Sequence, residues 1–326
     1  MGSMDLPNEL IRGAIDIHVH AGPHLISSPR RVDPFEAAEQ AREAGMRAIV
    51  YMDVFSDSCG TAWLVKRRIP GIEVFGGIIL NSCYGGINPR AVRTALHYGG
   101  GAKFVQFGTH STHFMTSREA KNIDGTLVPI KDLYPEFART ELSRSIQIPL
   151  DFISPELDEI LTLVAQYPGV YLNTGHVSGE EAIRLVDLSF SYGITGVVVA
   201  GTAVAELSVE EQKHVAGKGA YLEHSVAQYI GDGTIPRTHY YVEPEYMYDG
   251  IVDAAKHRPS LRGLGDQIRD VGPEHFIISS DYGLRALPTP VEGMRMMAAC
   301  LLDMAFSSEE IRTMMCTNPA NLLSLE

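Results

Sequence analysis

The sequence predicts an α/β protein, and two observations carry the prediction. Short apolar, β-like runs alternate with segments that open on helix-start residues along nearly all of the 326 residues. The runs are almost continuously apolar, which is typical of parallel strands covered by helices on both faces. Eight such units favour a closed (β/α)₈ barrel over other parallel sheets.

The eight expected strands share an apolar body and are Ala14–His20, Arg47–Met52, Glu73–Leu80, Ala102–Gly108, Val170–Gly175, Gly196–Ala200, Ala220–His224 and Phe276–Asp281. The segments between them offer an N-cap oxygen, often followed by proline or by a carboxylate three positions on, at Asp33, Asn88, Ser154, Ser178 and Ser208. The alternative is an open doubly wound sheet. The stretch after the first strand lacks the glycine-rich phosphate turn of such folds, which favours the barrel.

One domain is expected over residues 4–326, since Met1–Ser3 resembles a cloning remnant. Two connections are unusually long: Thr109 to Pro149 follows the fourth strand, and Val226 to Glu243 follows the seventh. Loops of this length usually cover a site or join subunits. We therefore expect them to lie over the carboxyl ends of the strands, and a homo-oligomer is a further expectation.

Composition limits the classes of function. The formal net charge is −13 and the single run of basic residues is Lys66–Arg68, which opposes a nucleic-acid partner. No apolar run is long enough for a membrane span or a signal peptide. The cysteines, Cys59, Cys83, Cys300 and Cys316, have no CxxC spacing and fit a reducing compartment. The expectation is a cytoplasmic protein that acts on a small molecule.

The first strand ends in a His-x-His pair, His18 and His20. Side chains alternate along an extended strand, so the two imidazoles point the same way, about 6.5 Å apart along the chain, with Asp16 beneath them. Two imidazoles that face one point can hold a metal ion. Isolated histidines at strand ends are more often structural, and the pair is therefore the stronger signal.

Other strands also end in polar or metal-binding residues. These are His176 after the fifth strand, Glu223 and His224 in the seventh, and Asp281 in the eighth. In a closed barrel the first and last strands are neighbours, so His18, His20 and Asp281 would meet. Histidines with a carboxylate suit zinc, manganese or iron. A metal-activated water makes hydrolysis the expected chemistry.

These motifs resemble the amidohydrolase superfamily of metal-dependent (β/α)₈ hydrolases, and within it a group of small predicted amidohydrolases. The similar stretches run nearly end to end: residues 16–23, 44–50, 75–81, 174–178, 207–212, 221–224, 278–281 and 317–323. The resemblance implies that His18, His20, His176 and Asp281 bind metal. It also implies that Asp281 accepts a proton from the attacking water.

The chain departs from the superfamily pattern in two strands. Val197–Thr202 has no sixth-strand histidine, and Tyr51–Phe55 lacks the lysine and histidine expected there. These departures favour one metal ion over two. Lys103 could in principle be a carboxylated bridge, but a solvated strand start is the preferred interpretation. His224 could replace the missing histidine, and it is also a candidate catalytic residue that stabilises the oxyanion.

The leading hypothesis is a metal-dependent hydrolase that opens an amide, ester, lactone or cyclic imide bond, with one divalent ion, zinc before manganese or iron. Candidate substrate-binding residues are His110, His113, Arg237 and Tyr240. Two alternatives keep the same site. One is a metal-dependent lyase such as a decarboxylase, and the other is a non-catalytic homologue with a degraded metal site.

Overall fold

The computed structural model describes residues 5–24, 29–230, 251–253 and 260–325. Its centre is built from parallel strands: β1 (Ile15–Val19), β2 (Ala48–Tyr51), β3 (Glu73–Phe75), β4 (Gly77–Ile79), β5 (Phe104–Gln106), β8 (Tyr171–Asn173), β9 (Val197–Val199), β10 (Tyr221–Ser225) and β12 (Phe276–Ser279). They form two sheets, ordered β1-β2-β3 and β12-β10-β9-β8-β5-β4. Every neighbouring pair is parallel. The predicted α/β class with parallel strands is confirmed.

The two sheets adjoin at both edges. The expected strand Glu73–Leu80 is divided at Gly76, where a Cβ atom would lie 2.4 Å from the backbone oxygen of Ser58, so only glycine fits there. At the other edge β12 leads into a parallel bridge between Val19 and Tyr282. The N–H of Asp281 donates to the His18 carbonyl at 2.9 Å. The carboxyl ends of the first and last strands are therefore joined directly.

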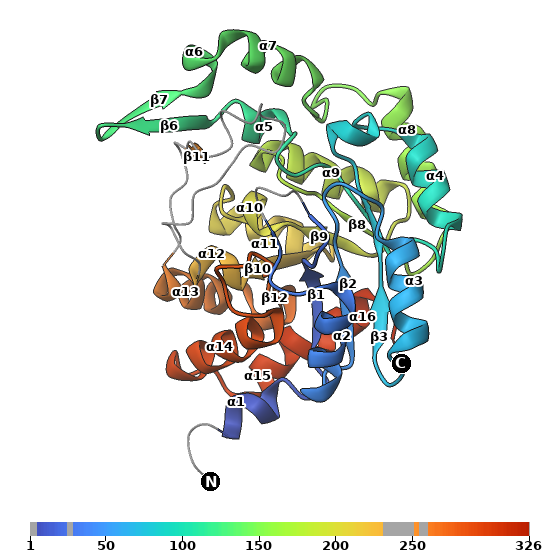
Figure 1. Cartoon of the computed structure of the whole chain (residues 1–326), viewed down its shortest axis with the longest axis vertical. Helices are drawn as coiled ribbons and strands as arrows, with labels where there is room; N and C mark the ends of the chain where they lie inside the picture. The colour runs from blue at the N-terminus through green and yellow to red at the C-terminus, as the bar shows by residue number, and fades with distance from the viewer. Residues whose placement is uncertain (1–4, 25–28, 231–250, 254–259, 326) are drawn as a thin grey trace.

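Helices lie around the parallel strands (Figure 1). The helices that follow or cover the strands are α1 (Asp5–Leu10), α2 (Pro34–Glu43), α3 (Cys59–Arg68), α4 (Pro89–His97), α8 (Pro155–Ala165), α9 (Gly179–Ser191), α10 (Gly201–Val204), α11 (Val209–Gly217), α12 (Val226–Tyr229), α13 (Leu261–Val271), α14 (Pro290–Asp303), α15 (Ser308–Arg312) and α16 (Asn318–Leu322). Short turns of helix occupy Ser82–Tyr84, Pro273–His275 and Thr313–Thr317. All five predicted N-caps accept a hydrogen bond from the first turn of their helix. The helix starts predicted from local sequence are thus confirmed.

The long connection after β5 is more structured than a loop. It contains α5 (His113–Thr116), β6 (Glu119–Ile123), β7 (Thr126–Pro129), α6 (Ile130–Leu133) and α7 (Pro135–Arg144), which project at the top of Figure 1. The strands β6 and β7 form a hairpin whose turn residues, Asp124 and Gly125, both have positive φ. An Asp-Gly pair of this kind is a strong hairpin signal, so this turn is also encoded in the local sequence.

A third strand connects the two long segments. β11 (Ile251–Asp253) pairs antiparallel with β6, so the sheet order is β11-β6-β7. The segment that follows β5 in the sequence thereby pairs with the segment that precedes β12. We call this three-stranded sheet the cross-loop sheet. No helix among the described residues is both long and apolar enough to cross a lipid bilayer.

Apolar packing lies on both sides of the parallel strands. One cluster includes Val50, Ile79, Phe104 and Ile277, which alternate along their strands with members of the larger cluster under the helices. Burial of both strand faces explains why the strands are nearly continuous apolar runs in the sequence. The polar exceptions among buried strand residues include His18, Glu223 and Ser279. Burial of such groups requires partners, which the candidate centre supplies.

Candidate metal centre

His18 and His20 approach each other through their Nε2 atoms, which are 3.2 Å apart. Their rings are nearly perpendicular, at 73°. The register of β1 shifts between Asp16 and Val19, a local irregularity that changes the simple alternation expected from sequence. Asp16 accepts from the backbone N–H groups of His18 and Ser280. The predicted shared direction of the two imidazoles is therefore seen, whereas the Asp16 carboxylate bonds backbone groups.

Asp281 completes a group of three. It follows β12, has a positive φ of 50°, and places Oδ1 3.1 Å from His20 Nε2 and 3.4 Å from His18 Nε2. Its Oδ2 accepts a hydrogen bond from the Ser225 hydroxyl at 3.3 Å. Burial by itself would raise the pKa of Asp281, but the two histidines outweigh burial and hold the pKa below its usual range. The carboxylate is thus ionised at neutral pH.

Each imidazole is fixed through its other nitrogen. His18 Nδ1 lies 2.8 Å from Glu223 Oε1, and His20 Nδ1 lies 2.8 Å from the carbonyl oxygen of Met52. A carbonyl or carboxylate oxygen accepts, so each Nδ1 carries the proton it donates. In the neutral rings the Nε2 atoms of His18 and His20 then carry lone pairs that face each other and the Asp281 carboxylate. Because these three groups are all electron-rich, a positive charge between them stabilises the arrangement.

A proton can also supply that charge. Burial opposes a charged His18, but Asp281 and Glu223 outweigh burial and raise the pKa of His18 to about 9. Burial lowers the pKa of the neighbouring His20. The centre thus attracts one positive charge onto His18 when no cation is bound. A divalent metal ion would compete with that proton for the same nitrogen.

The spacing of the three atoms fits a metal. Ligands about 2.0–2.1 Å from zinc in a tetrahedron lie about 3.4 Å from one another. The three distances here are 3.2, 3.4 and 3.1 Å. Among the residues the structure describes, this trio is the group of histidine, cysteine and carboxylate ligands close enough to share an ion. The donor chemistry and the geometry both fit a divalent cation such as zinc.

His176 stands beside this trio. It follows Gly175, whose φ is +69° and where a Cβ atom would lie 1.6 Å from the Phe107 carbonyl oxygen. Only glycine permits that approach. The charge of His176 contributes to the lowered pKa of Asp281, so the two residues are near each other. His176 as a fourth ligand stays a prediction, because its ring nitrogens are not among the three converging atoms.

Glu223 rather than His224 contacts His18, one of the two histidines of the pair. The His224 ring stacks on Phe276 at 5.0 Å and its Nδ1 lies 2.7 Å from the Tyr229 hydroxyl. Burial lowers the pKa of His224 to about 3, so the ring is neutral. Adjacent residues of a strand point to opposite faces, and Glu223 takes the face that carries His18. A catalytic or metal-binding role for His224 stays a prediction, and the described contacts of its ring are with Phe276 and Tyr229.

The remaining predicted residues are not among the three converging ligands, and two of them are not among the described residues. His110 is buried, with Nδ1 3.0 Å from the Thr109 hydroxyl. His113 Nδ1 lies 3.3 Å from Ser145 Oγ, within the segment between β5 and β8. Arg237 and Tyr240 fall outside the described residues. His110 and His113 as substrate contacts therefore stay predictions.

Lys103 lies at the opposite end of the strands from the histidines. It precedes β5, and its Nζ is 5.3 Å from the centre of the Phe75 ring. A Cβ atom at Gly169, which precedes β8, would lie 3.3 Å from the same Nζ. Burial lowers the pKa of Lys103. This position excludes Lys103 as a bridge between metal ions at the carboxyl ends of the strands.

Several solved structures share the fold across the chain. A "probable dipeptidase" from Pseudomonas aeruginosa is 13% identical, with a TM-score of 0.60, covering 98% of this chain and 97% of its own. An organophosphorus hydrolase from Deinococcus radiodurans is 14% identical (TM-score 0.56; coverage 99% and 94%). An amidohydrolase from Burkholderia multivorans is 12% identical (TM-score 0.54; coverage 96% and 99%). These likenesses agree with the amidohydrolase resemblance at the level of the fold.

Sequence comparison gives a family without a function. No curated protein matches the chain. The model of a family of unknown function, DUF6282, matches residues 13–223, which is more than half of the sequence. The chain belongs to the DUF6282 family.

Proposed function

We propose that this protein is a metal-dependent hydrolase of small molecules that opens an amide, ester, lactone or cyclic imide bond. The observation that carries the proposal is the convergence of His18 Nε2, His20 Nε2 and Asp281 Oδ1 at spacings of 3.1 to 3.4 Å. Fold likeness to structures named as hydrolases supports the same class. Fold alone would not, since one fold carries many chemistries.

The proposal includes a closed (β/α)₈ barrel. Two features support closure of the barrel. At one edge, β3 of the first sheet and β4 of the second are consecutive parts of one chain segment, separated only by Gly76. At the other edge, Val19 and Tyr282 form a bridge between the two sheets. In such a barrel the carboxyl ends of all the strands surround one mouth, where barrel enzymes carry their active sites. The histidine pair and Asp281 occupy that end of β1 and β12.

We propose one divalent ion, zinc before manganese or iron, held by His18, His20 and Asp281 with His176 as the further ligand. When bound, such an ion would polarise a substrate carbonyl and lower the pKa of a water to about 7. Three or four protein ligands leave an open position of the kind catalytic zinc sites keep. Lys103 lies at the other end of the strands and would not bridge two ions at this site.

The residues of the chain have separable tasks in this reaction. Asp281, ionised at neutral pH, accepts the proton of the attacking water and returns it to the leaving nitrogen or oxygen as the carbonyl–heteroatom bond breaks. The Asp281 side chain is 30% exposed, whereas Glu223 is 1% exposed, so substrate reaches the former and not the latter. Glu223 and the Met52 carbonyl orient the imidazoles.

Strands β6 and β7 of the cross-loop sheet and helices α5 to α7 follow β5, at the same end of the strands as the centre. Arg118, between α5 and β6, forms an ion pair with Glu206 at 3.1 Å and packs its guanidinium over Phe114. These contacts tie the segment to the region after α10. We propose that this segment covers the mouth and excludes bulk water, which strengthens electrostatic interactions inside the site.

Metal analysis and product analysis in ¹⁸O-labelled water test the proposal together. Protein purified without chelators should contain about one equivalent of divalent metal, and removal of the metal should abolish turnover that zinc or manganese restores. With a panel of esters, lactones, amides and imides, each bond that is hydrolysed should place one ¹⁸O atom in the carboxylate that forms, and none in the leaving alcohol or amine. Metal below about a tenth of an equivalent, with no gain on addition, would contradict both enzymatic hypotheses. Release of CO₂ without ¹⁸O incorporation would replace the hydrolase by a lyase.

A further inference from the structure

We propose that His24 and Arg30 form a carboxylate-binding subsite beside the metal centre, so that the substrates are small molecules with a carboxylate next to the bond that breaks. The inference rests on the proposed hydrolase function and adds the substrate class. It is carried by a pocket, by one cation, Arg30, that has no acidic partner in the part of the chain that the structure describes, and by the position of that cation relative to His20.

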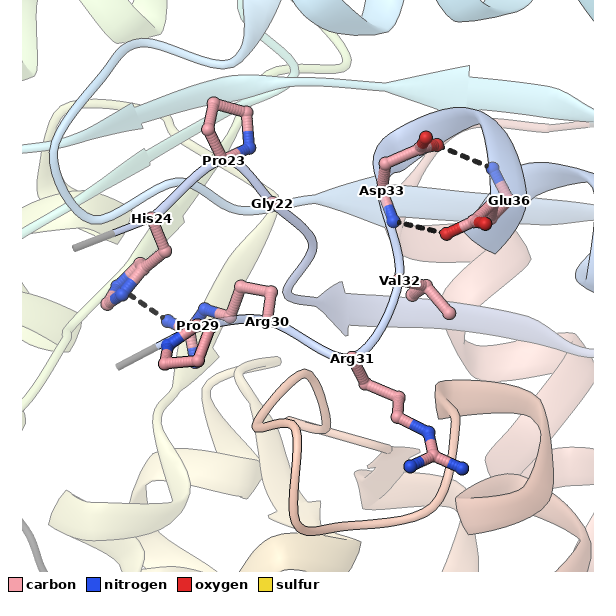
Figure 2. Close-up of a pocket in the computed structure, with 9 residues that line it drawn as sticks. All are labelled: Gly22, Pro23, His24, Pro29, Arg30, Arg31, Val32, Asp33 and Glu36. Carbon is pink, nitrogen blue, oxygen red and sulfur yellow. Dashed lines mark hydrogen bonds between the residues drawn. The ribbon is translucent and has the colours of Figure 1, made fainter. Parts of the chain in front are cut away.

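The pocket has a volume of about 380 Å³ and lies along the chain that leaves β1. Its wall includes Gly22 and Pro23, which stand two and three residues after His20 in the sequence. Figure 2 shows His24 and Arg30 pointing toward each other at one end and Asp33 and Glu36 at the start of α2 at the other. The volume is at the small end of the range for ligand pockets, and therefore suits a compact acid.

Arg30 and His24 form a directional pair. Arg30 Nη2 lies 2.9 Å from His24 Nε2 (Figure 2). A guanidinium can only donate, so His24 Nε2 accepts and His24 is neutral with its proton on Nδ1. The His24 ring packs against Phe55 at 5.1 Å, and Phe55 packs against His110 at 5.6 Å. Three strand-end segments therefore hold the pair in place.

The Arg30 charge has no carboxylate partner among the described residues, and its buried Nε–H makes no hydrogen bond there. The acidic side chains in the same pocket are already used. Asp33 accepts from the backbone N–H of Glu36, and Glu36 accepts from that of Asp33, in a capping box. A half-buried guanidinium with a free donor is stabilised by an oxyanion, and its fork matches a carboxylate.

The subsite adjoins the metal centre. The chain at Arg30 forms a bridge with Leu284, and the N–H of the next residue, Arg31, donates to the Gly283 carbonyl at 2.7 Å. A Cβ atom at Gly283 would lie 2.4 Å from the Cβ of His20, so the segment that carries Arg30 lies beside the chain that carries His20. A carboxylate held by Arg30 thus places the rest of a compact molecule toward His20 and Asp281. The pocket therefore orients an acidic substrate as well as binding it.

Arg31 offers a matched control. It lines the same pocket and carries the same charge, but its Nη1 donates to the Arg285 carbonyl at 3.3 Å and points away from His24 (Figure 2). Arg30→Gln and Arg31→Gln remove one charge each from the same wall. If the charges act only through the general electrostatic field, both variants should lose carboxylate affinity equally. If Arg30 binds the carboxylate directly, only Arg30→Gln should lose it.

The test is calorimetric titration of the metal-loaded protein with succinate and with its neutral isostere succinamide. Succinate should bind wild type at least about tenfold more tightly than succinamide, a difference of about 1.4 kcal/mol. Arg30→Gln should remove that preference, and Arg31→Gln should change it by less than about threefold. Equal affinity for the two probes, equal effects of the two variants, or tighter binding of inorganic phosphate than of succinate would overturn the carboxylate subsite.

A second measurement separates this subsite from the proposed function. The same titration on metal-free protein reports the Arg30 contribution without any hydrolytic activity. If Arg30→Gln binds succinate as wild type does while wild type hydrolyses neutral esters, the subsite is contradicted and the hydrolase is supported. If the preference for succinate depends on Arg30 but the purified protein holds no metal, the hydrolase is contradicted and an acid-binding site is supported. Circular dichroism of Arg30→Gln checks that the fold is retained.

Discussion

Oε1 of Glu223 lies 2.8 Å from Nδ1 of His18 and also accepts a hydrogen bond from the Ser279 hydroxyl at 2.6 Å. The contact fixes the ring of His18 and turns its Nε2 toward His20 and Asp281. A carboxylate behind a ligating histidine sets both its tautomer and its basicity. Glu223 is a positioning residue, since it contacts the histidine and not the atoms that would bind substrate.

Glu223→Gln should weaken zinc binding by about 10- to 100-fold, because the amide no longer stabilises the His18 ring as an anion does. Competition titration with a fluorescent zinc chelator measures the change. Ser279→Ala is the matched control: it removes the second hydrogen bond to the same oxygen and should cost less than about tenfold. Unchanged zinc affinity in Glu223→Gln would show that the contact has only a structural role.

His18→Ala and Asp281→Asn should abolish turnover while the fold is retained, since both side chains lie at the carboxyl end of the strands. Steady-state rates and circular dichroism measure the two effects. His97→Ala is the control, because that exposed histidine contacts Tyr167 on the surface and should leave turnover unchanged. Activity of either site variant within a few-fold of wild type contradicts the assignment.

Gly283→Ala should reduce metal content without unfolding the protein. An added Cβ would lie 2.4 Å from the Cβ of His20 and 2.5 Å from its carbonyl oxygen, so the chain that carries His20 must move. Small displacements are costly at a site whose ligands are held by their supporting residues. Metal content per chain is the measurement.

Gly217→Ala is the control for that variant. Nothing lies within 4 Å of an added Cβ at this helical position. The substitution should leave metal content unchanged and stabilise the fold by about 0.5–1 kcal/mol. Equal metal content in Gly283→Ala and Gly217→Ala would argue against a metal role for His20.

Stability should fall in mild acid because of His224. Burial lowers the pKa of this group from 6.5 to about 3, so between those pH values the unfolded chain binds more protons than the folded one. Stability therefore rises with pH through this window and is lost as pH falls below 6.5. From pH 6.5 to pH 5 the loss is about 2 kcal/mol. Urea unfolding at several pH values measures it.

His224→Phe keeps the stacking surface beside Phe276 and removes the titrating group. Its stability should depend less on pH by the same amount, and its metal content should equal that of wild type. Loss of turnover at unchanged stability in this variant would instead restore the catalytic role that the sequence suggested.

Local sequence determined the positions of the parallel strands, several helix starts and three of the candidate metal ligands. The apolar runs fixed the parallel strands, and the five cap residues fixed helix starts, because both depend on neighbours within a few positions. The His-x-His pair and Asp281 were also found from sequence, since polar residues that end apolar strands are conspicuous. The prediction that these three residues lie together followed from the strand count, because the first and last strands of a closed eight-stranded barrel are neighbours.

Tertiary structure decided what depends on distant partners or on the exact strand register. It placed Glu223, and not His224, against the His18 ring. A shift of one position along a strand reverses the face to which a side chain points, and sequence does not define the register. Tertiary structure paired β11 with β6 across more than a hundred residues, and it set Lys103 at the far end of the strands. It also brought His24, which pairs with Arg30 in the segment after β1, against Phe55 in the segment after β2. Such contacts reflect packing between elements, which no local pattern encodes.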